Sequence, residues 1–132
     1  MGKKFKNMGP VILVLIAGVF MLGSYLANAP GKYIRDINRE YKGVIINRFY
    51  QRGTQLTIRT TENKSFDVAL LSGDLIKEGA IGDSIEKLPG DNYVILNKNG
   101  VKMKLLYRHI PDYIRNNHRW PAEWKNKWLD GD

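Results

Sequence analysis

The chain has no cysteine among its 132 residues. This absence excludes disulfides, thiolate metal ligands, a cysteine nucleophile and lipidation on cysteine. Histidine is scarce too, and His109 and His118 have no acidic pair at metal-ligand spacing. Ser84 lacks the G-x-S-x-G context of a serine nucleophile, and no glycine-rich phosphate loop is present. We therefore expect a protein that is not an enzyme, with no catalytic residue, no metal site and no cofactor.

Charged residues are missing from a long N-terminal run. Residues 7–31 carry no charge, and only Lys3, Lys4 and Lys6 precede them. Residues 10–29 are long enough to cross a bilayer, which takes ~20 apolar residues in a helix. We predict a single-pass membrane anchor over residues 1–29. The residues expected to form this anchor are Val11, Leu15, Gly18, Leu22 and Gly23.

A cleaved signal peptide is the alternative for the same segment. Ala27-Asn28-Ala29 resembles a cleavage site, but Pro30 follows it and the apolar run is long for a signal peptide. We favour the uncleaved anchor. The short basic N-terminus is placed in the cytoplasm. The C-terminal domain is then outside the cytoplasm; in a bacterium with two membranes this predicts a location in the bacterial cell membrane, with the domain in the periplasm.

The rest of the chain divides into three predicted segments. Ala29-Pro30-Gly31 predicts a break in the helix. Residues 30–42 are expected to form a short amphipathic connector, residues 43–110 a small β-domain, and residues 111–132 a helical tail rich in Trp and Lys.

Alternation of apolar and polar residues begins at Gly43 and indicates strands. Asn99-Gly100, between two alternating runs, favours a hairpin with a type I′ turn. We predict a mainly β fold: a small antiparallel barrel or rolled sheet of SH3-like or OB-like size, followed by a short C-terminal helix. Strands are expected at 43–50, 55–61 and 65–71, followed by a helical turn at 75–78. A short strand that begins at 81 or 84 and ends at 88 comes next, and then a hairpin over 93–108.

Basic residues exceed acidic ones. After Pro30 there are 18 basic and 13 acidic residues, and from Lys98 to Lys127 there are eight basic and two acidic ones. This excess predicts a face for an anionic partner; a solvated strand face and tail are the alternative. Nucleic acid is not favoured, because the outward positions of the hairpin are mostly Lys and Arg rather than base-stacking aromatics. The residues of the predicted face are Lys102, Lys104, Arg108, Arg115, Arg119, Lys125 and Lys127.

Three tryptophans recur at a spacing of four. Trp120, Trp124 and Trp128 would form one stripe on a helix. The stripe predicts a docking surface for a membrane interface or an aromatic partner site. Packing of the stripe back onto the β-domain is the alternative.

Two short motifs carry a resemblance. They are Gly43-Val44-Ile45 and the turn-strand IGDSIEK at Ile81–Lys87, which precedes the hairpin. In this pattern, over roughly residues 11–107, the chain resembles small uncharacterised single-pass envelope proteins of Gram-negative bacteria. The resemblance implies bacterial origin and an envelope location, and it implies no activity.

Taken together, these features predict a membrane-anchored, non-enzymatic interaction module, an accessory subunit of an envelope or membrane complex with a protein partner. The alternative is a secreted or periplasmic binding domain for an anionic ligand such as cell-wall polymer or glycan. No small-molecule substrate is identified.

Overall fold

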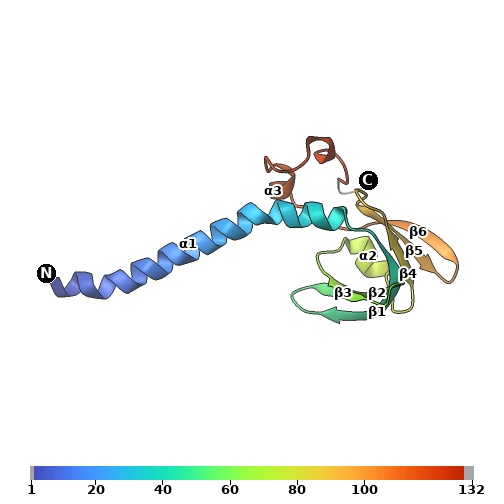
Figure 1. Ribbon diagram of the computed structural model, residues 1–132, viewed down its shortest axis with the longest axis horizontal. Helices are drawn as coiled ribbons and strands as arrows, with labels where there is room; N and C mark the ends of the chain where they lie inside the picture. Colours follow the sequence, from blue (N-terminus) through green and yellow to red (C-terminus); the bar gives the residue numbers. More distant parts are fainter. Residues whose placement is uncertain (1, 130–132) are drawn as a thin grey trace.

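The computed structural model describes the backbone of residues 2–129 and the side chains of residues 14–21 and 28–129. A long helix, α1 (Gly2–Ile37), leads into a β-domain and projects away from it (Figure 1). The strands are β1 (Tyr41–Tyr50), β2 (Thr54–Thr60), β3 (Ser65–Val68), β4 (Ser84–Lys87), β5 (Tyr93–Lys98) and β6 (Val101–Leu106). The short helices are α2 (Gly73–Glu78), α3 (Asp112–Arg115) and the 3-10 turn η1 (Ala122–Trp124).

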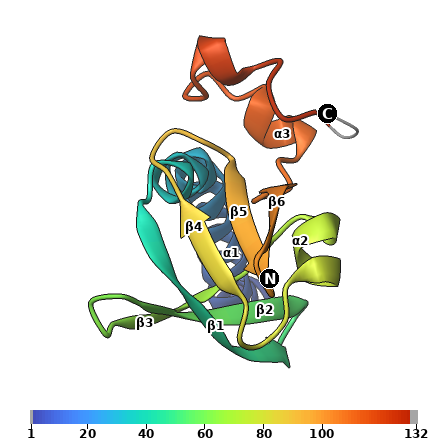
Figure 2. The same cartoon turned by 90° about the vertical axis from the view of Figure 1, so that its right-hand side faces the viewer.

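The six strands form one antiparallel sheet in the order β3-β2-β1-β4-β5-β6. The mainly β prediction is therefore confirmed. Closure into a barrel is wrong, because β3 and β6 are the two edges of an open sheet. The segment that carries α2 lies between these edges, where the Ser72 N–H donates to the Tyr107 carbonyl. Figure 2 shows the strong twist of the sheet: β2 and β3 run across the direction of β4 and β5, and β1 bends from alongside β4 to alongside β2.

The predicted hairpin is confirmed. Asn99 and Gly100 both have positive φ, 52° and 86°, as a type I′ turn requires. The turn joins β5 to β6 with Lys98 opposite Val101. Residues on one side of β6, among them Met103 and Leu105, pack against the core, while its lysines lie on the other side.

The predicted transmembrane anchor is wrong. In the described part of the chain, no helix combines the length and the apolar character needed to cross a membrane. Helix α1 also carries Lys32, Arg35 and Asp36 near its C-terminal end. The single-pass topology and the predicted place in the bacterial cell membrane are therefore wrong as well.

The predicted helix break at Ala29-Pro30-Gly31 is also absent. Helix α1 runs through these residues to Ile37, although a proline inside a helix removes one backbone hydrogen bond. Ala29 and Pro30 are both buried. The helix is therefore unbroken at the point where it packs on the domain.

Two apolar clusters hold the domain together. The first lies inside the sheet and includes Ile45, Leu56 and Leu96, with Leu75 of α2 fully buried among them. The second joins the C-terminal part of α1 to the tail. Its buried members are Ala29, Tyr33, Ile37, Ile110, Ile114, Trp120 and Trp128. Because Tyr93 and Leu106 pack against it, this cluster covers one end of the β5–β6 hairpin.

The tail does not form the predicted helix. Within its described residues, 111–129, only α3 and η1 are helical, and Trp128 has a positive φ of 56° that ends any regular helix. The tail chain instead folds back so that its tryptophans meet α1. The spacing of the three tryptophans predicted a regular helix, but their packing against α1 is made by an irregular chain instead.

Candidate binding surface

The face of the sheet that points away from the first cluster carries two rows of side chains. Cross-strand partners place Arg59, Val44, Ser84, Asn97 and Lys102 in one row that crosses β2, β1, β4, β5 and β6. Both ends of this row are therefore cationic, and its middle is apolar or neutral. We call this side of the sheet the outer face.

A second row runs beside the first. Lys42 of β1, Glu86 of β4, Ile95 of β5 and Lys104 of β6 are successive cross-strand partners. Lys104 also lies 4.5 Å above the ring of Tyr93, at the end of the face that the second cluster covers. The row adds two more cations and the only acid of the two rows.

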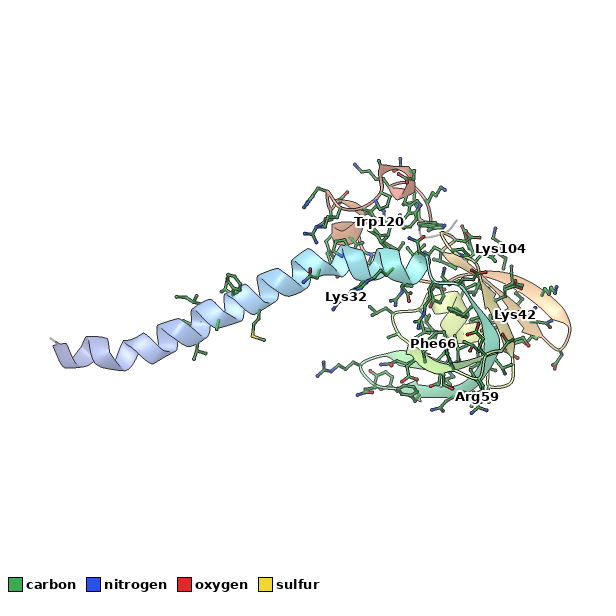
Figure 3. All side chains as sticks on the ribbon, viewed as in Figure 1. Lys32, Lys42, Arg59, Phe66, Lys104 and Trp120 are labelled. Carbon is green, nitrogen blue, oxygen red and sulfur yellow. The ribbon has the colours of Figure 1, made fainter. Side chains whose placement is uncertain are left out.

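The outer face is hollowed between these rows. The hollow has a volume of about 360 Å³, and its lining includes Lys42, Arg59 and Lys102. Val44, which is 39% exposed, and the half-buried Ile95 also line it. We call this hollow the outer groove. Figure 3 labels Lys42, Arg59 and Lys104, whose side chains stand on the surface of the domain.

The cations of the outer groove outnumber its one acid, Glu86, and form no ion pair among the described residues. Among the described residues the ion pairs are Lys64–Glu62, Lys98–Asp83 and Arg108–Asp36, and none involves a groove cation. Lys42 and Glu86 are cross-strand partners, yet they form no ion pair. The groove therefore presents positive potential over a partly apolar floor.

The structure separates the residues of the predicted anionic-partner face. Lys102 and Lys104 lie on the outer face, and Arg119, Lys125 and Lys127 are exposed on the tail. Arg108 and Arg115 instead point into the molecule. The sequence prediction also missed Lys42 and Arg59, although each occupies an outward position of its alternating strand.

Arg108 forms an internal ion pair. Its Nε donates to Asp36 Oδ2 of α1, and its guanidinium lies 5.5 Å from the centre of the Tyr33 ring. Burial alone would lower the pKa of Arg108, but the hydrogen bond and charge of Asp36 outweigh it, so the pKa is raised. Arg108 therefore joins the end of β6 to α1.

Arg115 fastens the tail. It is 8% exposed, and its guanidinium donates to the carbonyl oxygens of Lys127 and Trp128 and, at 3.5 Å, of Lys125. These carbonyls belong to no regular element and need donors. The arginine therefore acts as a structural bridge.

The tryptophan stripe packs on the domain. Trp120 and Trp128 are each 5% exposed, and Trp124 is half-buried between them. Neighbouring rings meet edge to face, with centroids 5.4 Å and 5.2 Å apart. Of the two alternatives for the stripe, the structure has the packed one, so Trp120 and Trp128 present almost no surface to a partner.

The residues named for the anchor lie on the projecting part of α1. Leu15 is 64% exposed, and a Cβ added to Gly18 would meet no atom within 4 Å. The side chains of Val11 and Leu22 and the surroundings of Gly23 lie outside what the structure describes.

A buried lysine was missed by the sequence prediction. Lys87 is fully buried, and its Nζ donates to the carbonyl oxygens of Ile37, Leu88 (3.0 Å) and Asp91 (2.8 Å). Burial lowers the pKa of Lys87 to about 8. The signal in the sequence is its place two residues after Ile85, which puts it on the inner side of β4.

Among the residues whose side chains the structure describes, no three His, Asp or Glu side chains come together as a possible metal site. The fold and surface define a small open-sheet domain with a cationic groove. Comparisons with protein-family models, curated proteins and solved structures returned no match. The resemblance to Gram-negative envelope proteins stays a prediction.

Proposed function

We propose that this protein is a non-enzymatic interaction module, an accessory subunit that binds an acidic segment of a partner protein in the outer groove. The observation that carries the proposal is the set of cations around that groove. Lys42, Arg59 and Lys102 line it together with a single acid, Glu86, and none of these three cations forms an ion pair among the described residues. An acidic chain would supply the missing charge.

The shape of the groove supports an extended occupant. Its cations stand on β1, β2 and β6, so they are spread across the sheet rather than gathered at one point. Val44 and Ile95 offer apolar contact between them. A chain with alternating acidic and apolar side chains matches this layout, because charges set orientation and apolar area adds affinity.

The proposal is tested with a fluorescent peptide of alternating Glu and Val residues, titrated by anisotropy with the full chain. Replacing Lys42, Arg59 and Lys102 together by Gln should weaken binding at least about tenfold, because exposed charge pairs each contribute up to about 1 kcal/mol. A matched control replaces three exposed lysines elsewhere, Lys64, Lys77 and Lys125. Equal losses in both triple variants would contradict the proposal.

An anionic polysaccharide is the second candidate occupant. Ser84 and Asn97 stand in the middle of the first row, where a hydroxyl and an amide can hydrogen-bond sugar hydroxyls. Titration with polygalacturonate separates the two. Binding of this polymer in place of the peptide, with loss in the groove variant, would favour the second candidate.

A further inference from the structure

The C-terminal part of α1 carries a basic pocket that shares no lining residue with the outer groove. It has a volume of about 350 Å³ and is lined by Lys32, Arg35, Asp36, Arg39 and Arg108. Lys32 and Arg35 lie one turn apart on the same side of α1, and Arg39 lies two residues beyond the end of the helix. Figure 3 shows Lys32 where α1 passes over the domain.

The one acid of this pocket is already engaged. Asp36 accepts the hydrogen bond from Arg108. Arg35 forms no ion pair in the described part of the chain, and Arg39 stacks on the Phe66 ring at 3.9 Å. The pocket therefore retains excess positive charge. The nearby C-terminal end of α1 would repel an anion, but the Lys87 ammonium bonds the Ile37 carbonyl there and offsets this effect.

A second pocket adjoins the basic one. It has a volume of about 360 Å³ and shares Lys32 and Arg108 with it. Its remaining lining is apolar or aromatic: Ala29, Tyr33, Leu70, Pro111 and Tyr113. Its size is that of small-molecule sites, which start near ~300 Å³.

The apolar wall contains a strained residue. Leu70 has a φ of 55°, a conformation that a branched side chain rarely adopts, and is 59% exposed. Tyr113 on α3 is 56% exposed at the same pocket. Two large apolar side chains therefore stand in water beside a cationic pocket, and strain of this kind often occurs at ligand sites.

From this juxtaposition we infer that the two pockets form one bipartite site for a small organic phosphate that carries an aromatic ring. The arginines would take the phosphate oxygens, because the guanidinium group binds such oxygens in a bidentate way. The ring would lie between Leu70 and Tyr113, covering both side chains. The site extends the proposed function, since it is separate from the outer groove.

The experiment is calorimetric titration of the full chain with phenyl phosphate, inorganic phosphate and phenol at low salt. Phenyl phosphate should bind at least about tenfold more tightly than either fragment, because each part of it fills one pocket. Equal affinity of phenyl phosphate and inorganic phosphate would overturn the inference.

Two variants test the phosphate-binding part and the ring-binding part of the site separately. Arg35→Gln should weaken phenyl phosphate and inorganic phosphate by the same factor. Leu70→Asn, which tolerates the positive φ, should remove the advantage of phenyl phosphate and leave inorganic phosphate unchanged. If either variant binds both ligands as the native chain does, the inference fails.

Two controls complete the test. Lys77→Gln removes an exposed charge from α2, and the joint replacement of Lys42 and Arg59 by Gln alters only the outer groove. Both should bind phenyl phosphate as the native chain does. Loss of affinity in these controls equal to that in Arg35→Gln would show diffuse charge attraction and overturn the site. Failure of the peptide experiment would leave these affinities unaffected.

Discussion

Lys87 of β4 donates a hydrogen bond from its Nζ to the carbonyl oxygen of Ile37, the last residue of α1. The two residues are 50 positions apart in the chain. A helix ends in carbonyl groups with no partner inside the helix, and a cation there is favourable. This contact therefore joins the helix to the sheet at a fully buried position.

Replacing Lys87 by Met should destabilise the fold by about 2 kcal/mol, because the carbonyl groups of Ile37, Leu88 and Asp91 lose their shared donor. Urea unfolding followed by circular dichroism measures the change. Lys77→Met, at an exposed position of α2, is the matched control and should stay within about 0.5 kcal/mol of the native value. A Lys87 variant as stable as the control would contradict this role.

Stability should also depend on pH through Lys87. The pKa of Lys87 is lowered by burial to about 8 from 10.5, so between these values the unfolded chain binds more protons than the folded one. The free energy of unfolding therefore rises from pH 8 towards pH 10, by about 2 kcal/mol. Lys87→Met should lack this rise.

Above pH 10 the trend should reverse. Burial raises the pKa of both Tyr41 and Tyr107 above 10.0, so the unfolded chain loses protons there that the folded chain keeps. Stability falls as a result. Chemical unfolding at a series of pH values should show a maximum near pH 10, and a monotonic rise to pH 11 would contradict it.

The alternating strands and the Asn99-Gly100 turn could be predicted from the sequence, because both are local patterns. The edges of the sheet could not. Whether β3 meets β6 depends on where the α2 segment lies, and its contact with Tyr107 joins residues far apart in the chain. An open sheet and a barrel have the same strand pattern.

The candidate site was predicted only in part. Lys102 and Lys104 were found because they share one hairpin, but Lys42 and Arg59 reach the same face through pairing of β1 with β4 and β2. Arg108 and Arg115 were misjudged for the same reason. The number of charged residues can be counted in a sequence. Whether a buried carboxylate or carbonyl group pairs with one of them can be seen only in the fold.

Replacing Arg115 by Met should release the tail. The carbonyl groups of Lys127 and Trp128 would lose their donors, and the buried tryptophans would gain contact with water. We expect the tryptophan emission to shift to longer wavelength while the β-sheet circular dichroism is kept. Lys125→Met, at an exposed tail position, should leave the emission unchanged. Unchanged emission in the Arg115 variant would contradict the bridging role.

Gly43 of β1 lies close to the backbone of β2. A Cβ on this residue would lie 2.3 Å from the carbonyl oxygen of Arg59, so the two backbones would have to move apart. Gly43→Ala should cost at least about 2 kcal/mol in urea unfolding. Gly31→Ala, with no atom within 4 Å, should instead stabilise α1 by about 0.5–1 kcal/mol. Equal effects of the two substitutions would contradict the close approach.

The most direct measurement of the proposed function is amide chemical-shift mapping of the isotopically labelled full chain during titration with the acidic Glu-Val peptide. We predict that the shifts concentrate on the groove residues, including Val44, Ser84 and Asn97, and diminish as salt screens the charges. Shifts confined to the tail or spread evenly over all exposed lysines, with the groove residues unmoved, would contradict the assignment of the outer groove as the binding surface.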